Sequence, residues 1–140
     1  RARRAAALMV IDTSALLAVL RGETSMRALL EAIERADRRS LSVASFVEAS
    51  IVLEARFGAD GVRELDRFLA TAGIECLPVD LEQSRAARDA FRQFGKGRHA
   101  AGLNFGDCFA YALAQCRHEP LLFTGDDFAR TDVVPAWLPA

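Results

Sequence analysis

The sequence predicts a single α/β/α domain with a central, mostly parallel sheet of four to five strands. Its 140 residues fit one domain, and 51% hydrophobic against 26% charged residues is typical of a chain with an apolar core. Short apolar runs alternate with segments of helical periodicity, and this alternation indicates parallel strands joined by helices. We expect the domain to cover residues 8–140. Residues 1–7 are interpreted as an N-terminal extension outside the fold or a remnant added to the chain.

The first strand is predicted at residues 8–11, whose unbroken apolar run is typical of a strand buried on both faces of a sheet. Asp12, Thr13 and Ser14 follow, and an apolar helical stretch continues over residues 15–20. Ligands of open α/β sheets bind at the carboxyl ends of the strands, and a buried carboxylate requires a partner. Asp12 is therefore either a helix N-cap or a ligand-binding group, and this stretch alone does not distinguish the two.

The remaining elements follow from periodicity and from capping residues. Further helices are expected at residues 24–35, 45–57, 62–72, 80–94 and 107–116. Further strands are expected at residues 41–44, 74–79 and 121–124, with a short fifth strand at the sheet edge at 133–134. Asp60 and Asp80 are predicted N-caps, and Gly58 is placed to end a helix. Residues 95–106 form a basic loop rich in glycine.

Charge and cysteine content exclude several classes of protein. A formal net charge of −1 gives no overall positive field, so a polyanion would need a local site. Three cysteines without C-x-x-C spacing are typical of reduced thiols. The chain has no apolar run of membrane-spanning length and no signal-peptide pattern at its start. We therefore expect a cytoplasmic protein that does not interact with membranes.

Acidic residues occur where strands end or helices begin. They are Asp12, Glu48, Asp107 and the pair Asp126 and Asp127. Each has a structural alternative. Ser45 and Glu48 have the spacing of a capping box, as do Asn104 and Asp107, and Gly-Asp-Asp is ordinary turn sequence.

Considered together, the acidic residues predict a metal site. Parallel strands can bring them to one edge of the sheet, where uncompensated carboxylates would repel one another. Oxygen ligands favour Mg²⁺ or Mn²⁺, and such an ion suits phosphoryl chemistry. Lys96, Arg98 and His99 precede Asp107 and either contact substrate phosphates or form a solvated connector. Neither His99 nor His118 has the spacing of a soft-metal site.

Four stretches resemble the PIN-domain ribonucleases, and more closely the VapC toxins of bacterial toxin–antitoxin pairs. They read MVIDTSALLAVL, SFVEASIVLEARFG, GKGRHAAGLNFGDCFAYALA and PLLFTGDDFARTDV. The resemblance runs from residue 9 to about residue 139. It implies a PIN fold and Mg²⁺- or Mn²⁺-dependent endonucleolytic cleavage of RNA that leaves 5′-phosphate and 3′-hydroxyl ends. Structured RNA such as tRNA or rRNA would be the target, and cleavage would inhibit translation and growth.

The resemblance also implies partners and site residues. It implies a homodimer that forms a heterotetramer or larger complex with a cognate VapB-type antitoxin. Asp12, Glu48 and Asp107 match the acidic set of the family. The fourth acidic residue is Asp126 when counted from Thr-x-Asp, and Asp127 when counted back from Asp-Phe; Asp127 is favoured. Asp12, Asp107, Glu48 and Asp127 would bind metal, and Ser14 would orient a water or a phosphate.

Three other functions are alternatives to this one. A phosphatase of the haloacid-dehalogenase type needs Asp-x-Asp after the first strand, but Ser14 occupies the third position. A phospho-acceptor receiver domain needs an acidic pair at that turn and a late lysine near the site, and both are missing. A catalytically silent PIN module that binds RNA or a protein partner is the remaining alternative. The complete set of acidic residues argues against it.

Overall fold

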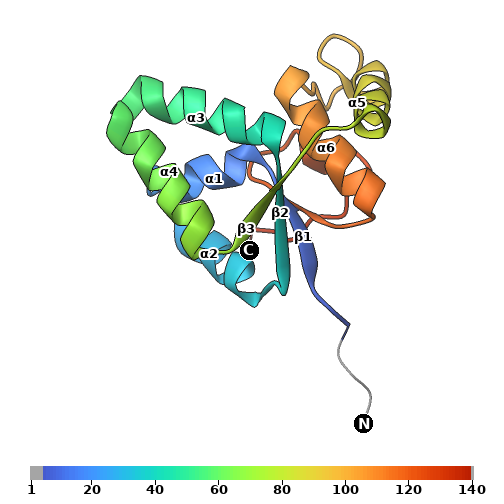
Figure 1. Cartoon of the computed structure of the whole chain (residues 1–140). Helices are drawn as coiled ribbons and strands as arrows, with labels where there is room; N and C mark the ends of the chain where they lie inside the picture. The colour runs from blue at the N-terminus through green and yellow to red at the C-terminus, as the bar shows by residue number, and fades with distance from the viewer. Residues whose placement is uncertain (1–4, 140) are drawn as a thin grey trace.

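The computed structural model describes residues 5–139 and shows one parallel sheet between two layers of helices (Figure 1). Its four strands lie in the order β3-β2-β1-β4, and every neighbouring pair is parallel. The strands are β1 (Leu8–Ile11), β2 (Arg38–Ser42), β3 (Ile74–Leu77) and β4 (Leu121–Leu122). This architecture confirms the predicted α/β class.

Within residues 5–139, six α-helices connect the strands, and one short 3₁₀ helix follows β4. They are α1 (Thr13–Leu20), α2 (Met26–Arg35), α3 (Val43–Phe57), α4 (Ala59–Thr71), α5 (Leu81–Phe94), α6 (Phe105–Arg117) and η1 (Phe128–Arg130). Figure 1 shows α1 to α4 on one side of the sheet and α5 and α6 on the other.

Strand β1 lies inside the sheet and is buried on both faces, as its apolar sequence predicts. Met9 and Ile11 pack with α1, α2, α3 and α4, whereas Val10 packs with α5 and α6. Side chains alternate between the faces of a strand, so β1 belongs to both halves of the core. Asp12 follows β1 directly and is thereby fixed at the carboxyl end of a central strand.

The predicted fifth strand is reduced to a single bridge. The Leu121 N–H donates to the Val134 carbonyl oxygen, and the Ala136 N–H donates to the Leu121 carbonyl oxygen, both at 2.9 Å. Pro135 lies between these two residues and has no N–H to extend the ladder. The segment therefore covers the edge of β4 without forming a regular strand.

Most helix starts differ from the predictions by two or three residues, and those of α3 and α4 have identifiable causes. Helix α3 begins at Val43, because the Ser42 hydroxyl caps it by accepting from the Ala44 N–H at 3.2 Å. The expected capping box of Ser45 and Glu48 is therefore wrong, and Glu48 lies inside the helix.

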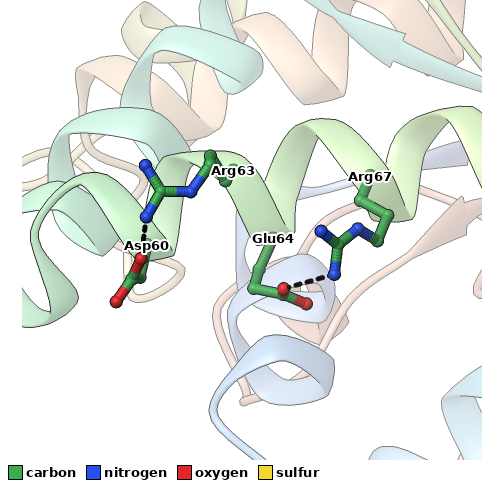
Figure 2. A network of polar contacts seen from close by, with 4 residues as sticks. All are labelled: Asp60, Arg63, Glu64 and Arg67. Carbon is green, nitrogen blue, oxygen red and sulfur yellow. Dashed lines mark hydrogen bonds and ion pairs between the residues drawn. The ribbon is translucent and has the colours of Figure 1, made fainter.

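Helix α4 begins directly after Gly58, whose φ of 67° reverses the chain. Asp60 lies in its first turn and pairs with Arg63, so it is not the predicted N-cap, and Glu64 pairs with Arg67 one turn later (Figure 2). These exposed pairs add little stability. The predicted cap Asp80 is confirmed, since its Oδ1 accepts from the Gln83 N–H at 2.8 Å.

Ala7, near the N-terminus, is hydrogen-bonded to the rest of the domain. The Ala7 N–H donates to Asp37 Oδ2 at 2.7 Å, and the Ala7 carbonyl oxygen accepts from the Asp37 N–H at 2.7 Å. Residues 1–4 of the predicted extension lie outside the described residues. Within residues 5–139, no helix combines the length and apolar character needed to cross a bilayer.

Candidate metal centre at the carboxyl end of the sheet

Asp12 caps helix α1 and is almost completely buried. Its Oδ2 accepts from the Ser14 N–H at 2.9 Å, so the capping interpretation of the sequence is correct. Asp12 is only 2% exposed, and its Oδ1 has no hydrogen-bond partner among the described residues. Burying a carboxylate oxygen without a hydrogen-bond donor costs free energy, so the capping role explains only one of the two carboxylate oxygens of Asp12.

The electrostatics of Asp12 reflect this burial. Burial raises the pKa of Asp12 from 3.8 to about 7, while hydrogen bonds from Ser14 lower it. The charges of Asp107 and Glu48 raise the pKa further, which shows that both carboxylates act on Asp12. Three acidic side chains from different segments therefore interact electrostatically at this end of the sheet.

Asp107 lies in the first turn of α6, where it forms the predicted capping box with Asn104. Its N–H donates to Asn104 Oδ1 at 2.8 Å, and the Asn104 N–H donates to Asp107 Oδ2 at 3.0 Å. Burial raises the pKa of Asp107, the bond from Asn104 lowers it, and the charges of Glu48 and Asp127 raise it. The capping box thus holds a carboxylate that also faces other carboxylates.

Glu48 and the pair after β4 complete the acidic cluster. The Glu48 carboxylate lies directly against Gly106, the residue before Asp107, so α3 delivers it to the start of α6. Asp126 and Asp127 are both exposed in the turn after β4. Of these two, it is Asp127 whose charge raises the pKa of Asp107. We refer to Asp12, Glu48, Asp107 and Asp127 as the acidic cluster.

Ser14 connects the ends of two strands. Its Oγ accepts from the Thr124 N–H at 3.1 Å, and its backbone N–H donates to Asp12. The hydroxyl therefore ties the segment after β4 to the carboxylate after β1. The structure places Ser14 beside Asp12, with its oxygen already engaged inside the protein, and its role toward a water or a phosphate remains a prediction.

The basic loop lies beside the start of α6 (Figure 1), and its charged side chains are exposed. The Arg98 guanidinium lies 5.8 Å from the centre of the Phe91 ring. His99 has a structural role, because its Nδ1 accepts from the Ala101 N–H at 2.9 Å and its ring packs edge-on against Phe94. Lys96 and Arg98 remain the cations that the loop offers to solvent, and their predicted phosphate contacts remain a prediction.

The chemistry of the donors fits a hard divalent cation. Asp12 supplies a buried oxygen without a donor, and its neighbours in the acidic cluster offer only oxygen ligands. Cys108 is nearby, but burial and the Asp107 charge raise the pKa of its thiol to about 11, so it stays protonated and unsuited to soft metals. Within residues 5–139, no group of three acidic, histidine or cysteine side chains is arranged to hold a metal ion in this structure.

Two features of the centre were not identified from the sequence. Gly106 makes room for the Glu48 carboxylate, and the Thr124 N–H anchors Ser14. The glycine directly before Asp107 was a possible signal, because a glycine inside a helix often marks a close approach. Thr124 contributes through its backbone N–H, so its residue type gives no indication of this role.

Known proteins share this fold and sequence pattern. The family model of the PIN domain matches residues 9–134. A VapC ribonuclease of Mycobacterium bovis is 50% identical over 131 residues, which cover 94% of this chain and 100% of that protein. A ribonuclease VapC of Mycolicibacterium smegmatis is 52% identical over 125 residues, 89% of this chain and 97% of the relative.

Solved structures agree in fold at much lower identity. VapC20 of Mycobacterium tuberculosis, described as a Sarcin-Ricin loop cleaving toxin, matches with a TM-score of 0.74 at 15% identity, over 90% of this chain and 96% of that one. A toxin–antitoxin complex from Klebsiella pneumoniae matches with a TM-score of 0.70 at 17% identity, over 92% and 98%. The solved structures agree in fold, and the matches in sequence show that this chain belongs to the VapC family of PIN-domain proteins.

Proposed function

We propose that this protein is the toxin of a toxin–antitoxin pair and a Mg²⁺- or Mn²⁺-dependent endoribonuclease. The buried Asp12 oxygen without a donor, at the carboxyl end of a central strand, is the observation that carries the proposal. The relatives at 50% and 52% identity are named ribonucleases, which supports RNA as the substrate.

Asp12 and Asp107 would be the principal metal ligands, and Glu48 and Asp127 would bind the metal directly or through water. A bound divalent cation lowers the pKa of a coordinated water and neutralises charge on the phosphate. The chain itself would orient these groups. Ser14 and Asn104 donate to the two aspartates and fix their positions. Glu48 would accept a proton from the attacking water. Breakage of the bond between phosphorus and the 3′ oxygen would leave a 5′-phosphate, and the departing oxygen would take a proton from solvent to become a 3′-hydroxyl.

The substrate would be structured RNA such as tRNA or rRNA, cut in a loop whose bases are unpaired. Lys96 and Arg98 are exposed beside the start of α6 and would contact backbone phosphates near the acidic cluster. His99 would shape this loop and contact substrate from it. Ser14, placed next to Asp12, would orient a water or a phosphate. Cleavage of such RNA would inhibit translation and growth in the cytoplasm.

A cognate VapB-type antitoxin would inhibit the enzyme, as the toxin–antitoxin complexes among the structural neighbours suggest. A homodimer would form the core of the heterotetramer or larger complex. Exposed apolar side chains support self-association: Val47 is 52% exposed, Ile51 64% and Phe105 78%. They flank a groove of about 400 Å³ between α3 and α6, whose wall includes Glu48.

The proposal is tested with purified chain freed of its antitoxin. RNA is incubated with Mn²⁺ or with EDTA, binding is measured in parallel, and new 5′ ends are mapped. We expect cleavage at defined positions with Mn²⁺ and none with EDTA. RNA that is bound but left uncut in Mn²⁺ would instead favour the catalytically silent module.

A further inference from the structure

The Glu48 carboxylate occupies the space that a side chain at position 106 would fill. A Cβ built on Gly106 would lie 2.7 Å from Glu48 Cδ and 2.8 Å from Oε1, and it would overlap Oε2. We propose that Gly106 is a positioning residue whose missing side chain seats the Glu48 carboxylate beside Asp107. This inference rests on the proposed function, in which Glu48 acts on the metal or its water.

Backbone conformation does not explain a glycine at this position. Gly106 lies in the first turn of α6 and does not adopt the left-handed φ seen at Gly58 and Gly125. Alanine is a better helix former than glycine, so position 106 favours alanine on local grounds. The close approach of Glu48 is therefore the feature that requires a hydrogen here.

The position of Glu48 has an electrostatic consequence. The Glu48 charge raises the pKa of both Asp107 and Asp12, so the space beside Gly106 keeps the Glu48 carboxylate within the acidic cluster. The start of a helix favours an anion, which lets the carboxylate stay there despite its acidic neighbours. Glu48 is only partly buried and ends in a flexible side chain. An added methyl group would therefore turn it out of the cluster without unfolding the protein.

Gly61 shows what a different kind of contact would do. A Cβ on Gly61 would meet the Leu53 backbone oxygen at 2.5 Å, so α3 and α4 themselves would have to separate. At Gly106 a movable carboxylate meets the added atom, and the three nearest heavy atoms all belong to the Glu48 side chain. Loss of function without loss of stability is thus expected at Gly106, and loss of stability at Gly61.

The experiment compares Gly106→Ala, Glu48→Ala and the double variant. Gly106→Ala should reduce RNA cleavage about tenfold to a hundredfold, as expected for a misplaced catalytic group. It should weaken Mn²⁺ binding to the RNA-free protein, measured by calorimetry. Its melting temperature in metal-free buffer should equal or exceed that of the natural chain. In the Glu48→Ala background the same glycine substitution should cause no further loss of cleavage.

A shorter acid provides a rescue test. Glu48→Asp withdraws the carboxylate by one methylene, so adding Gly106→Ala to it should cost no activity. Full cleavage and Mn²⁺ affinity in Gly106→Ala, with loss in Glu48→Ala, would overturn the positioning role alone. A lowered melting temperature with equal loss of cleavage in both backgrounds would also overturn it. Full activity of Glu48→Ala would overturn the role of Glu48 itself, and with it the proposed mechanism.

Discussion

Asp12 performs two tasks with its two carboxylate oxygens. One oxygen caps α1, and the other is buried without a donor. Because burial raises its pKa to about 7, the ionised group destabilises the metal-free protein at neutral pH. The folded protein binds this proton more tightly than the unfolded chain, whose Asp keeps a pKa of 3.8. Stability from this group is thus full below pH 3.8 and is lost as the pH rises to 7.

Asp12→Asn therefore has a stability effect with a definite sign. Asparagine keeps the cap and removes the charge, so the variant should be more stable than the natural chain at pH 7.5 without metal, by up to about 4 kcal/mol. The advantage should shrink toward pH 4, where Asp12 stays protonated in the folded protein and the unfolded chain begins to take up the same proton. Thermal melts in EDTA from pH 4 to 8 check this. A destabilised variant at pH 7.5 would show that capping dominates.

The turn after β4 offers a matched pair of substitutions. The Asp127 charge acts on Asp107, so Asp127→Asn should reduce Mn²⁺-dependent cleavage about tenfold or more, in line with effects of groups around metals. Asp126→Asn changes the same charge one residue away and serves as the control, with activity close to the natural chain. Initial cleavage rates on one RNA make the comparison. The reverse order would assign the fourth position to Asp126.

For the helices, sequence patterns predicted which segments are helical more accurately than they predicted the residue at which each helix begins. Asp80 and the box of Asn104 and Asp107 were recognised because capping chemistry is local. Ser42 was missed as the cap of α3 because Ser45 has the same chemistry and a suitable partner in Glu48. The packing of α3 against the sheet, which no local pattern contains, decides between them.

The basic loop before α6 is expected to contribute affinity through phosphate contacts. Lys96→Ala with Arg98→Ala should weaken RNA binding and reduce the slope of log affinity against log salt, because fewer counterions are released. The double variant Arg63→Ala with Arg67→Ala removes two exposed arginines from α4 and provides the control. Binding is measured by fluorescence anisotropy at several salt concentrations. An unchanged slope for the loop variant would show that the loop does not touch phosphate.

For the whole molecule, the sequence predicted one parallel sheet and an acidic cluster at its edge. It did not contain the strand order, because β3-β2-β1-β4 results from packing between segments far apart in the chain. That order places Asp12 between the neighbours β2 and β4, whose following segments carry Glu48 and Asp127. Asp107 arrives from α6 on the other face. The residue types were readable from the sequence, but their distances were not.

The association of two copies of the chain is also a property of the whole molecule. If the apolar face of α3 and α6 is the dimer interface, Ile51→Glu should yield a monomer by placing a charge among Val47 and Phe105. Sedimentation velocity checks the mass of both proteins. Glu54→Gln, an exposed change further along α3, should remain dimeric as a control. A dimer of Ile51→Glu would place the interface elsewhere.

In the proposed mechanism, the acidic cluster binds the catalytic metal. Titration calorimetry of Mn²⁺ into the antitoxin-free protein at pH 7.5, beside the variant Asp107→Asn, tests it most directly. We expect saturable binding to the natural chain and affinity at least about tenfold weaker in the variant, together with loss of RNA cleavage. Equal Mn²⁺ affinity and equal cleavage in both proteins would contradict it.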